Sequence, residues 1–148
     1  MAKVQIKKLK DNATLPTTGS AYAAGYDLYA CLDGDGEITI PSHHTVKIPT
    51  GVAAALPEGT FGGVFARSGL ASKEGLRPAN CVGVCDSDYR GEYIVALHND
   101  SDTVRTVNNG DRIAQLVIMP FLSAEFLEVE SLEETERGAG GFGSTGKK

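Results

Sequence analysis

The stretch "NCVGVCDSDYRGEYIVALHN", residues 80–99, indicates the fold class of this chain. Two runs of strand-forming residues, "NCVGV" and "EYIVAL", flank the polar segment "DSDYRG", and this pattern predicts a β-hairpin with its tip at residues 86–91. Runs rich in β-branched and aromatic residues occupy residues 37–40, 44–48, 61–65, 92–99 and 112–121. Only residues 69–76 look helical. Many short strands separated by turn residues predict an all-β fold, a sandwich or barrel with one short helix.

The length and composition are those of one globular domain with an extension. A chain of 148 residues is most economically a single domain, and 41% hydrophobic and 22% charged residues are ordinary for a soluble protein. No apolar run approaches the roughly 20 residues needed to span a bilayer, so no membrane partner is expected. From Ser131 the acidic "SLEETE" gives way to "RGAGGFGSTGKK". We therefore predict a body over residues 1–130 and a flexible arm over residues 131–148.

The charge and the cysteines restrict the partners and the compartment. The net charge of −5 argues against a nucleic-acid partner, because sequence-independent binding neutralises many phosphates. A small anionic ligand is still compatible, since a few arginines and a divalent metal ion reverse the local field. The three cysteines are Cys31, Cys81 and Cys85. Without CxxC pairs or a secretory signal they indicate reduced thiols and a cytoplasmic protein, or a nuclear one in a eukaryote. Cys81 and Cys85 are expected to pack as small hydrophobic side chains.

Two polar segments outside the predicted hairpin carry candidate ligand-binding residues. Asp27 stands among the strand formers of "AGYDLYA", and it either caps a turn or anchors a metal ion or its waters. Taken alone, the cap is favoured. Arg67 and Ser68 lie between an apolar strand and the short helix, where they would make an anion cradle with exposed amides. The alternative, that Ser68 caps the helix and Arg67 is solvated, is at least as well supported by so short a motif.

An aspartate and a glutamine in strand-like surroundings are further candidates. Asp86 follows apolar Val84 and Cys85, so the framework can hold its carboxylate in place. An aspartate that is ionised at neutral pH can orient or deprotonate a water molecule. Gln115, in "RIAQLVI", is either an edge residue or a buried amide with a dedicated partner. The glycine-rich tail lacks the spacing of a phosphate-binding Walker loop.

These five stretches, in this order on an all-β chain, resemble the five motifs of the trimeric deoxyuridine triphosphate nucleotidohydrolase (dUTPase) family. The resemblance runs from about Tyr22 to Gly146, and its most specific segments are "GVCDSDYRGE", "RIAQ" and "RGAGGFGSTG". Ala66 stands where the family commonly has proline, and Cys85 where it commonly has isoleucine. Neither side chain is expected to touch substrate, so both departures are expected to leave activity intact.

The resemblance implies a fold and a reaction. Each subunit would be a distorted jelly-roll-like β-sandwich or barrel with a flexible C-terminal arm, and three subunits would form a homotrimer that shares its active sites. The reaction would be hydrolysis of dUTP to dUMP and pyrophosphate by attack of water on the α-phosphorus, with Mg²⁺ as cofactor. Such an enzyme keeps uracil out of DNA and supplies dUMP for dTMP synthesis.

The resemblance also implies a role for each candidate residue. Asp86 would activate the attacking water and hold the 3′-hydroxyl, and Tyr89 would lie against the deoxyribose and exclude a 2′-hydroxyl. Asp27 would hold Mg²⁺ through water, and Gln115 would contact the α-phosphate region and help position the attacking water. Arg67, Ser68 and Gly69 would bind phosphates, and the backbone near Asn80, Gly83 and Val84 would read the uracil edge. In the tail, Arg137 would pair with the γ-phosphate, Phe142 would stack on uracil, and the phosphates would be wrapped by Gly143, Ser144 and Thr145.

Two rival functions are less compatible with the residues present. The related deoxycytidine triphosphate deaminases typically show tryptophan where Tyr89 stands and a catalytic glutamate where Ala96 stands. This chain contains no tryptophan, and alanine cannot transfer a proton. A catalytically silent binding protein on the same fold would lack Asp86 or the tail motif, and both are present here.

Overall fold

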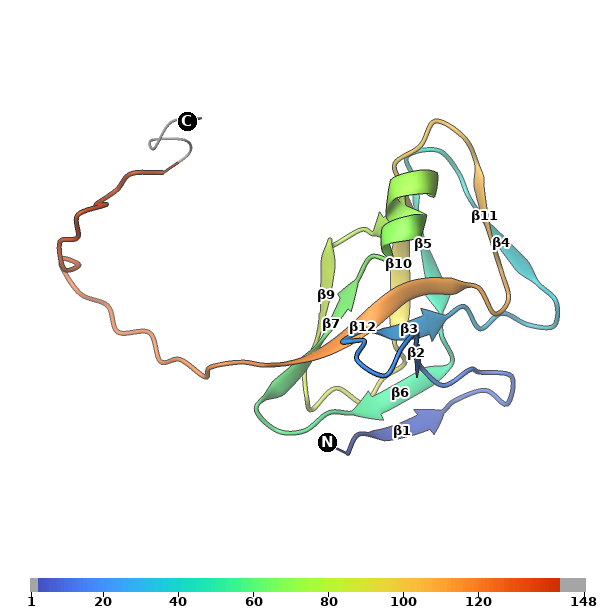
Figure 1. Ribbon diagram of the computed structural model, residues 1–148, viewed down its shortest axis with the longest axis horizontal. Coiled ribbons are helices and arrows are strands. Elements are labelled where there is room, and N and C mark those ends of the chain that lie inside the picture. Colours follow the sequence, from blue (N-terminus) through green and yellow to red (C-terminus); the bar gives the residue numbers. More distant parts are fainter. Residues whose placement is uncertain (1–2, 142–148) are drawn as a thin grey trace.

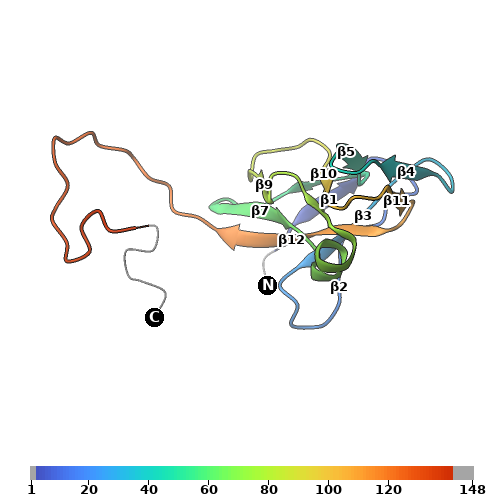
Figure 2. The same cartoon turned by 90° about the horizontal axis from the view of Figure 1, so that it is seen from above.

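The computed structural model describes residues 3–141, which form β-strands and one short helix (Figures 1 and 2). The strands are β1 (Gln5–Lys8), β2 (Thr17–Thr18), β3 (Tyr26–Tyr29), β4 (Glu37–Ile40), β5 (Thr45–Pro49), β6 (Val52–Ala55), β7 (Thr60–Phe65), β8 (Leu76–Pro78), β9 (Val82–Cys85), β10 (Ile94–Asn99), β11 (Arg105–Asn108) and β12 (Arg112–Pro120). The helix, η1, spans Leu70–Glu74 and ends at Gly75, whose φ of +71° favours glycine. The prediction of an all-β fold with one short helix is confirmed. Within residues 3–141, no helix is long and apolar enough to cross a membrane.

The strands form two main sheets with the core between them. One sheet has the order β2-β3-β12-β7-β9, the other has the order β5-β10-β8, and the pairs β11-β4 and β1-β6 complete the body. Figure 2 shows β5 and β10 on one side of the molecule and β12 and β3 on the other. Val64 and Leu116 of the first sheet belong to the same buried cluster as Val95 and Leu97 of the second. Along β10 buried residues alternate with more exposed ones, as expected of an antiparallel strand with one face on a core.

The hairpin predicted at residues 80–99 is wrong in its pairing. β9 pairs with β7, whereas β10 pairs with β5 and β8, so the segment "DSDYRG" crosses from one sheet to the other. Tyr93 fixes the crossing, because its N–H donates to the carbonyl of Val52 at 2.9 Å and its own carbonyl accepts a hydrogen bond from the Thr50 hydroxyl. Proximity along the chain favours a hairpin, but the inward side chains Val95 and Leu97 place β10 in the opposite sheet.

The three cysteines are free thiols in different environments. Cys31 is buried and Cys85 is half-buried against the core, and burial raises the pKa of both thiols. Cys81 is exposed, so the expectation that it packs as a small hydrophobic side chain is wrong. Its φ of +61° makes a left-handed turn just before β9, and this turn ends the strand alternation on which the expectation rested.

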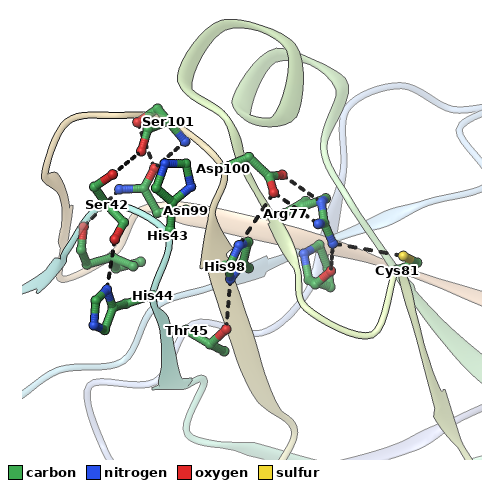
Figure 3. A network of polar contacts seen from close by, with 12 residues as sticks. Ser42, His43, His44, Thr45, Arg77, Cys81, His98, Asn99, Asp100 and Ser101 are labelled. Atoms are coloured by element: carbon green, nitrogen blue, oxygen red, sulfur yellow. Dashed lines mark hydrogen bonds and ion pairs between the residues drawn. The ribbon is translucent and has the colours of Figure 1, made fainter.

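A buried asparagine joins the end of β10 to the loops beside it (Figure 3). Asn99 is fully buried, and its Nδ2 donates to the carbonyls of Ile40, Pro41 and Thr103 at 3.0, 3.3 and 2.7 Å. Its Oδ1 accepts hydrogen bonds from the N–H and the hydroxyl of Ser101. One side chain therefore satisfies backbone groups of two separate segments, residues 40–41 and 101–103, and its own hydrogen-bonding groups are satisfied as burial requires.

Replacing Asn99 by alanine should lower the free energy of unfolding by about 3 kcal/mol, because several buried carbonyls would lose their donor. Urea unfolding followed by circular dichroism measures the change. The control is Asn108→Ala, since Asn108 is exposed and its side chain donates only a long hydrogen bond, 3.3 Å, to Asp111. This control should cost less than about 1 kcal/mol. Equal costs in the two variants would show that the Asn99 network does not stabilise the fold.

The chain leaves the body after β12. Residues 121–141 contain no strand or helix, and Figure 1 shows them running away from the sheets. Large apolar side chains are exposed along this segment, namely Phe121, Leu122, Phe126, Leu127, Val129 and Leu132. The last strand ends at Pro120, eleven residues before the predicted start of the arm at residue 131. That boundary stays a prediction.

Candidate active site

An aspartate held by two arginines forms the first half of the candidate site. Asp27 lies on β3, where Arg67 Nε donates to Asp27 Oδ1 at 2.8 Å and Arg112 Nη1 donates to Asp27 Oδ2 at 3.2 Å. The Asp27 side chain is 14% exposed. Its place within a strand and its two partners rule out the turn cap. Two guanidinium groups around one carboxylate leave a net positive charge, which suits an anionic ligand.

The segment between β7 and η1 carries Arg67 and Ser68, and the alternative roles predicted for both residues are wrong. The Arg67 side chain is 26% exposed and paired with Asp27, so it is not simply solvated. The helix begins after Gly69 without a side-chain cap, and the carbonyl of Ser68 accepts a hydrogen bond from the Ser72 hydroxyl at 2.6 Å. Ser68 is therefore not a helix cap. Its side chain remains a candidate ligand for phosphate.

Gln115 occupies the central strand of the five-stranded sheet. β12 is flanked by β3 and β7, so the edge alternative is wrong. In register, Gln115 lies opposite both Asp27 and Phe65, and its Nε2 donates to the carbonyl of Ala66 at 2.9 Å. A Cβ at Gly25 would collide with Gln115 Oε1, so glycine there leaves room for the amide. The structure brings Asp27, Arg67 and Gln115 together.

The segment that crosses between the sheets and the strands β9 and β10 beside it line a separate pocket of about 280 Å³. Predicted residues lie on its wall: Asn80, Gly83, Val84, Asp86 and Tyr89. The pocket also contains Tyr93 and Ala96, to which sequence reasoning gave no binding role. Its size and mixed lining suit part of a small organic ligand.

Tyr93 and Arg112 are the residues that sequence reasoning missed. Arg112 was visible in the motif "RIAQ", but its pairing with Asp27 joins positions 85 residues apart. Tyr93 lies under Tyr89, with ring centroids 6.2 Å apart and ring planes inclined by 21°. The only signal for Tyr93 was a second tyrosine four residues after the first, which a strand pattern does not distinguish from an ordinary core residue.

The two halves of the candidate site lie apart in one chain. Gln115 is opposite Phe65 on β7, whereas Cys85, next to Asp86, is opposite Gly62 on the far side of β7. Three residues along a strand and two strand spacings separate these positions by about 15 Å. One copy of the chain therefore does not bring Asp86 to Gln115.

Arg137 is the one tail candidate among the described residues 3–141. Arg137 Nε donates to the carbonyl of Gly140 at 2.9 Å, a contact within the arm. The remaining tail candidates lie outside the described residues, namely Phe142, Gly143, Ser144 and Thr145.

The residues present suit a magnesium ion held through its waters. Among residues 3–141, no group of three or more metal-ligating side chains gathers at one place. Asp27 is a single carboxylate whose oxygens already accept hydrogen bonds from arginines. Mg²⁺ keeps most of its waters and binds through one or two carboxylates and substrate phosphates. The site thus fits a water-mediated contact in the presence of phosphates, and not a dedicated protein cage.

Comparison with known proteins gives a consistent family. A family model described as dUTPase matches residues 11–146. A deoxyuridine 5′-triphosphate nucleotidohydrolase of Desulfitobacterium hafniense is 55% identical, with 93% of this chain and 91% of the relative covered. Its counterpart from Oryza sativa subsp. japonica is 48% identical, with 97% and 80% covered.

Solved structures show the same likeness. The dUTPase of Staphylococcus bacteriophage 80alpha with dUpNHpp superposes with a TM-score of 0.88 at 30% identity, covering 99% of both chains. A mutant dUTPase of phage phi11 of S. aureus, for which coordination of a structural Mg(II) ion is described, gives a TM-score of 0.77 at 28% identity. It covers 90% of this chain and 100% of the phage protein. The likeness in sequence and fold extends over nearly all of the chain.

Proposed function

This chain belongs to the dUTPase family and is a dUTP diphosphatase, and from this premise we propose a Mg²⁺-dependent attack of water on the α-phosphorus of dUTP. The products are dUMP and pyrophosphate. The observation that carries the proposal is the division of the site into a nucleoside-sized pocket with Asp86 and a cationic cluster with Gln115. The two halves suit the two ends of a nucleoside triphosphate.

A homotrimer would bring these halves together. Asp86 and Gln115 lie about 15 Å apart in one chain, which is too far for both to reach one phosphorus atom. A head-to-tail contact around a three-fold axis would place Asp86 of one subunit beside Asp27, Arg67 and Gln115 of the next. The exposed apolar side chains that follow β12, such as Phe126 and Leu127, support packing against another subunit.

The chain's own residues would divide the chemistry. Asp86 orients the attacking water and takes its proton, while the Gln115 amide directs that water at the α-phosphorus. Arg67 offers charge-assisted hydrogen bonds to the phosphate oxygens. When bound, magnesium offsets the charge of the triphosphate and of departing pyrophosphate. Asp27 is the residue that would hold its waters.

The nucleoside pocket would select the base and the sugar. The backbone near Asn80, Gly83 and Val84 reads the uracil edge, and Tyr89 lies against the deoxyribose. Ala96 lines the pocket at the position where deaminases carry a glutamate, so no side chain there transfers a proton to the base. We also propose a cytoplasmic location, or a nuclear one in a eukaryote, and the three free cysteines support it.

A product analysis in ¹⁸O-labelled water tests the proposed function. The protein is incubated with Mg²⁺ and each deoxynucleoside triphosphate in turn, and products are identified by chromatography and mass spectrometry. We expect dUMP and pyrophosphate from dUTP alone, with the label in dUMP and with activity lost in EDTA. Label in pyrophosphate would place the attack on the β-phosphorus, and release of dUDP or ammonia would refute the reaction.

Deleting residues 137–148 should lower kcat/KM for dUTP by at least about 100-fold, because the ligands that close over the triphosphate would be lost. Arg137, Phe142, Gly143, Ser144 and Thr145 are the proposed closing residues. Steady-state pyrophosphate release measures the loss, and size-exclusion chromatography checks the assembly. Removing only residues 147–148 is the matched control and should leave activity unchanged. A fully active 1–136 protein would refute the closing role of the tail.

A further inference from the structure

The ring of Tyr89 is held by three features of its own crossing segment. Its face lies on Tyr93, at a centroid distance of 6.2 Å. Its hydroxyl donates to the carbonyl of Glu92 at 3.1 Å. Gly91 leaves the space that the phenol end of the ring fills, because a Cβ there would collide with the Tyr89 hydroxyl and ring carbons. The side chain is still 44% exposed, so part of the ring is open to a ligand.

Tyr93 is itself a fixed support. It is 3% exposed, and both its N–H and its carbonyl are bonded to the segment that carries Thr50 and Val52. Within residues 3–141 its buried hydroxyl has no hydrogen-bond partner. Burial raises the pKa of Tyr93 to about 12, so the ring stays neutral at physiological pH. Because the Tyr93 ring is neutral and buried and its backbone is anchored, it has little freedom to move when a ligand contacts the Tyr89 ring stacked on it.

We propose that Tyr93 is a positioning residue for sugar discrimination, holding Tyr89 at a fixed depth so that deoxyribonucleoside triphosphates enter and ribonucleoside triphosphates do not. This inference rests on the proposed function. A 2′-hydroxyl is rejected only when the side chain that it meets stays in place. The Tyr89 ring turns about two rotatable bonds, so without a support it would move aside. The stacked pair supplies that support from below, and the Glu92 carbonyl and Gly91 fix the ring at its end.

The quantity to measure is the ratio of kcat/KM for dUTP to kcat/KM for UTP. In Tyr93→Leu the flat support is lost, and we expect the ratio to fall about fivefold to tenfold, the change that loss of one aromatic pair can produce. The fall should arise mainly from better use of UTP, with kcat for dUTP reduced less than about threefold. Tyr93→Phe keeps the ring and removes the unpartnered hydroxyl, so its ratio should match the wild type.

A second variant reaches Tyr89 without altering the core. Gly91→Ala should displace the Tyr89 ring, because the new Cβ collides with the far end of that side chain, which can move. The displacement should lower the ratio as Tyr93→Leu does. Gly19→Ala is its matched control, since a Cβ at Gly19 meets nothing within 4 Å. Thermal unfolding of each variant separates a loss of support from a loss of fold. Gly91→Ala keeps the test decisive if Tyr93→Leu does not fold.

The outcomes separate this inference from the proposed function. If the wild type hydrolyses dUTP selectively but folded Tyr93→Leu or Gly91→Ala keeps the same ratio, the positioning role is refuted and the enzymatic function stands. A wild type that hydrolyses dUTP and UTP equally would refute the positioning role and the proposed selection of the sugar, while dUTP hydrolysis itself would stand. A wild type without dUTP hydrolysis would overturn both. A Tyr93→Phe ratio as low as that of Tyr93→Leu would assign discrimination to the hydroxyl and refute the stacking argument.

Discussion

The Asp86→Asn substitution should lower kcat for dUTP by about 1,000-fold or more, while the variant still binds the nucleotide. A general base contributes roughly 10²–10⁴-fold, and an amide cannot take the proton of the attacking water. Asparagine has nearly the same shape and can still accept a hydrogen bond from a sugar hydroxyl, so binding should change little. Asp86 is exposed at the wall of the pocket, and its replacement should leave the fold intact.

Two measurements make this test decisive. Steady-state kinetics give kcat, and calorimetric titration with dUpNHpp gives the affinity independently of turnover. The matched control is Asp88→Asn, because Asp88 is an exposed carboxylate two residues away that does not line the pocket. Its kcat should stay within about twofold of the wild type. If Asp86→Asn turned over dUTP at the rate of Asp88→Asn, Asp86 would not be the residue that activates water.

The sequence contains enough local information to predict the strands and the junctions between them. The runs at residues 61–65 and 112–121 correspond to β7 and β12, and the helix follows Arg67 as expected. Strand-forming residues and turn residues act over a few neighbours, so these features can be inferred from short windows. The predicted residues of this stretch also lie on one pocket, because they are close along the chain, namely Asn80, Gly83, Val84, Asp86 and Tyr89.

Pairings between distant segments could not be predicted in the same way. The partner of β10 is set by which side chains share the core, and this depends on the whole chain. For the same reason Asp27 looked like a turn cap until Arg67 and Arg112 were seen to hold it. Motif order suggested that Asp27 and Gln115 act together, and their opposed positions on β3 and β12 agree with this. The motif order gave no physical reason for Asp86 to be absent from that group.

Subunit complementation tests the proposed sharing of each site between two subunits. Homotrimers of Asp86→Asn and of Arg67→Ala should each be nearly inactive, because each lacks one half of every site. When the two proteins are unfolded together in urea and refolded as a 1:1 mixture, activity should return to about a quarter of the wild-type value. A site needs an intact Asp86 from one subunit and an intact Arg67 from the next, and random assembly supplies each with a chance of about one half.

The size of the recovery distinguishes the architectures. If each chain carried a complete site, no chain in the mixture would hold both intact residues, and the mixture would remain as inactive as its components. A refolded mixture of Asp86→Asn and Asp86→Ala is the control, since no subunit in it carries the carboxylate. Activity well below a quarter in a mixture proven to contain mixed trimers would mean that Asp86 and Arg67 of the same chain act in one site. The distance between Asp86 and Gln115 within one chain predicts the opposite, because only a neighbouring subunit can bring the carboxylate to the phosphates that Arg67 and Gln115 would hold.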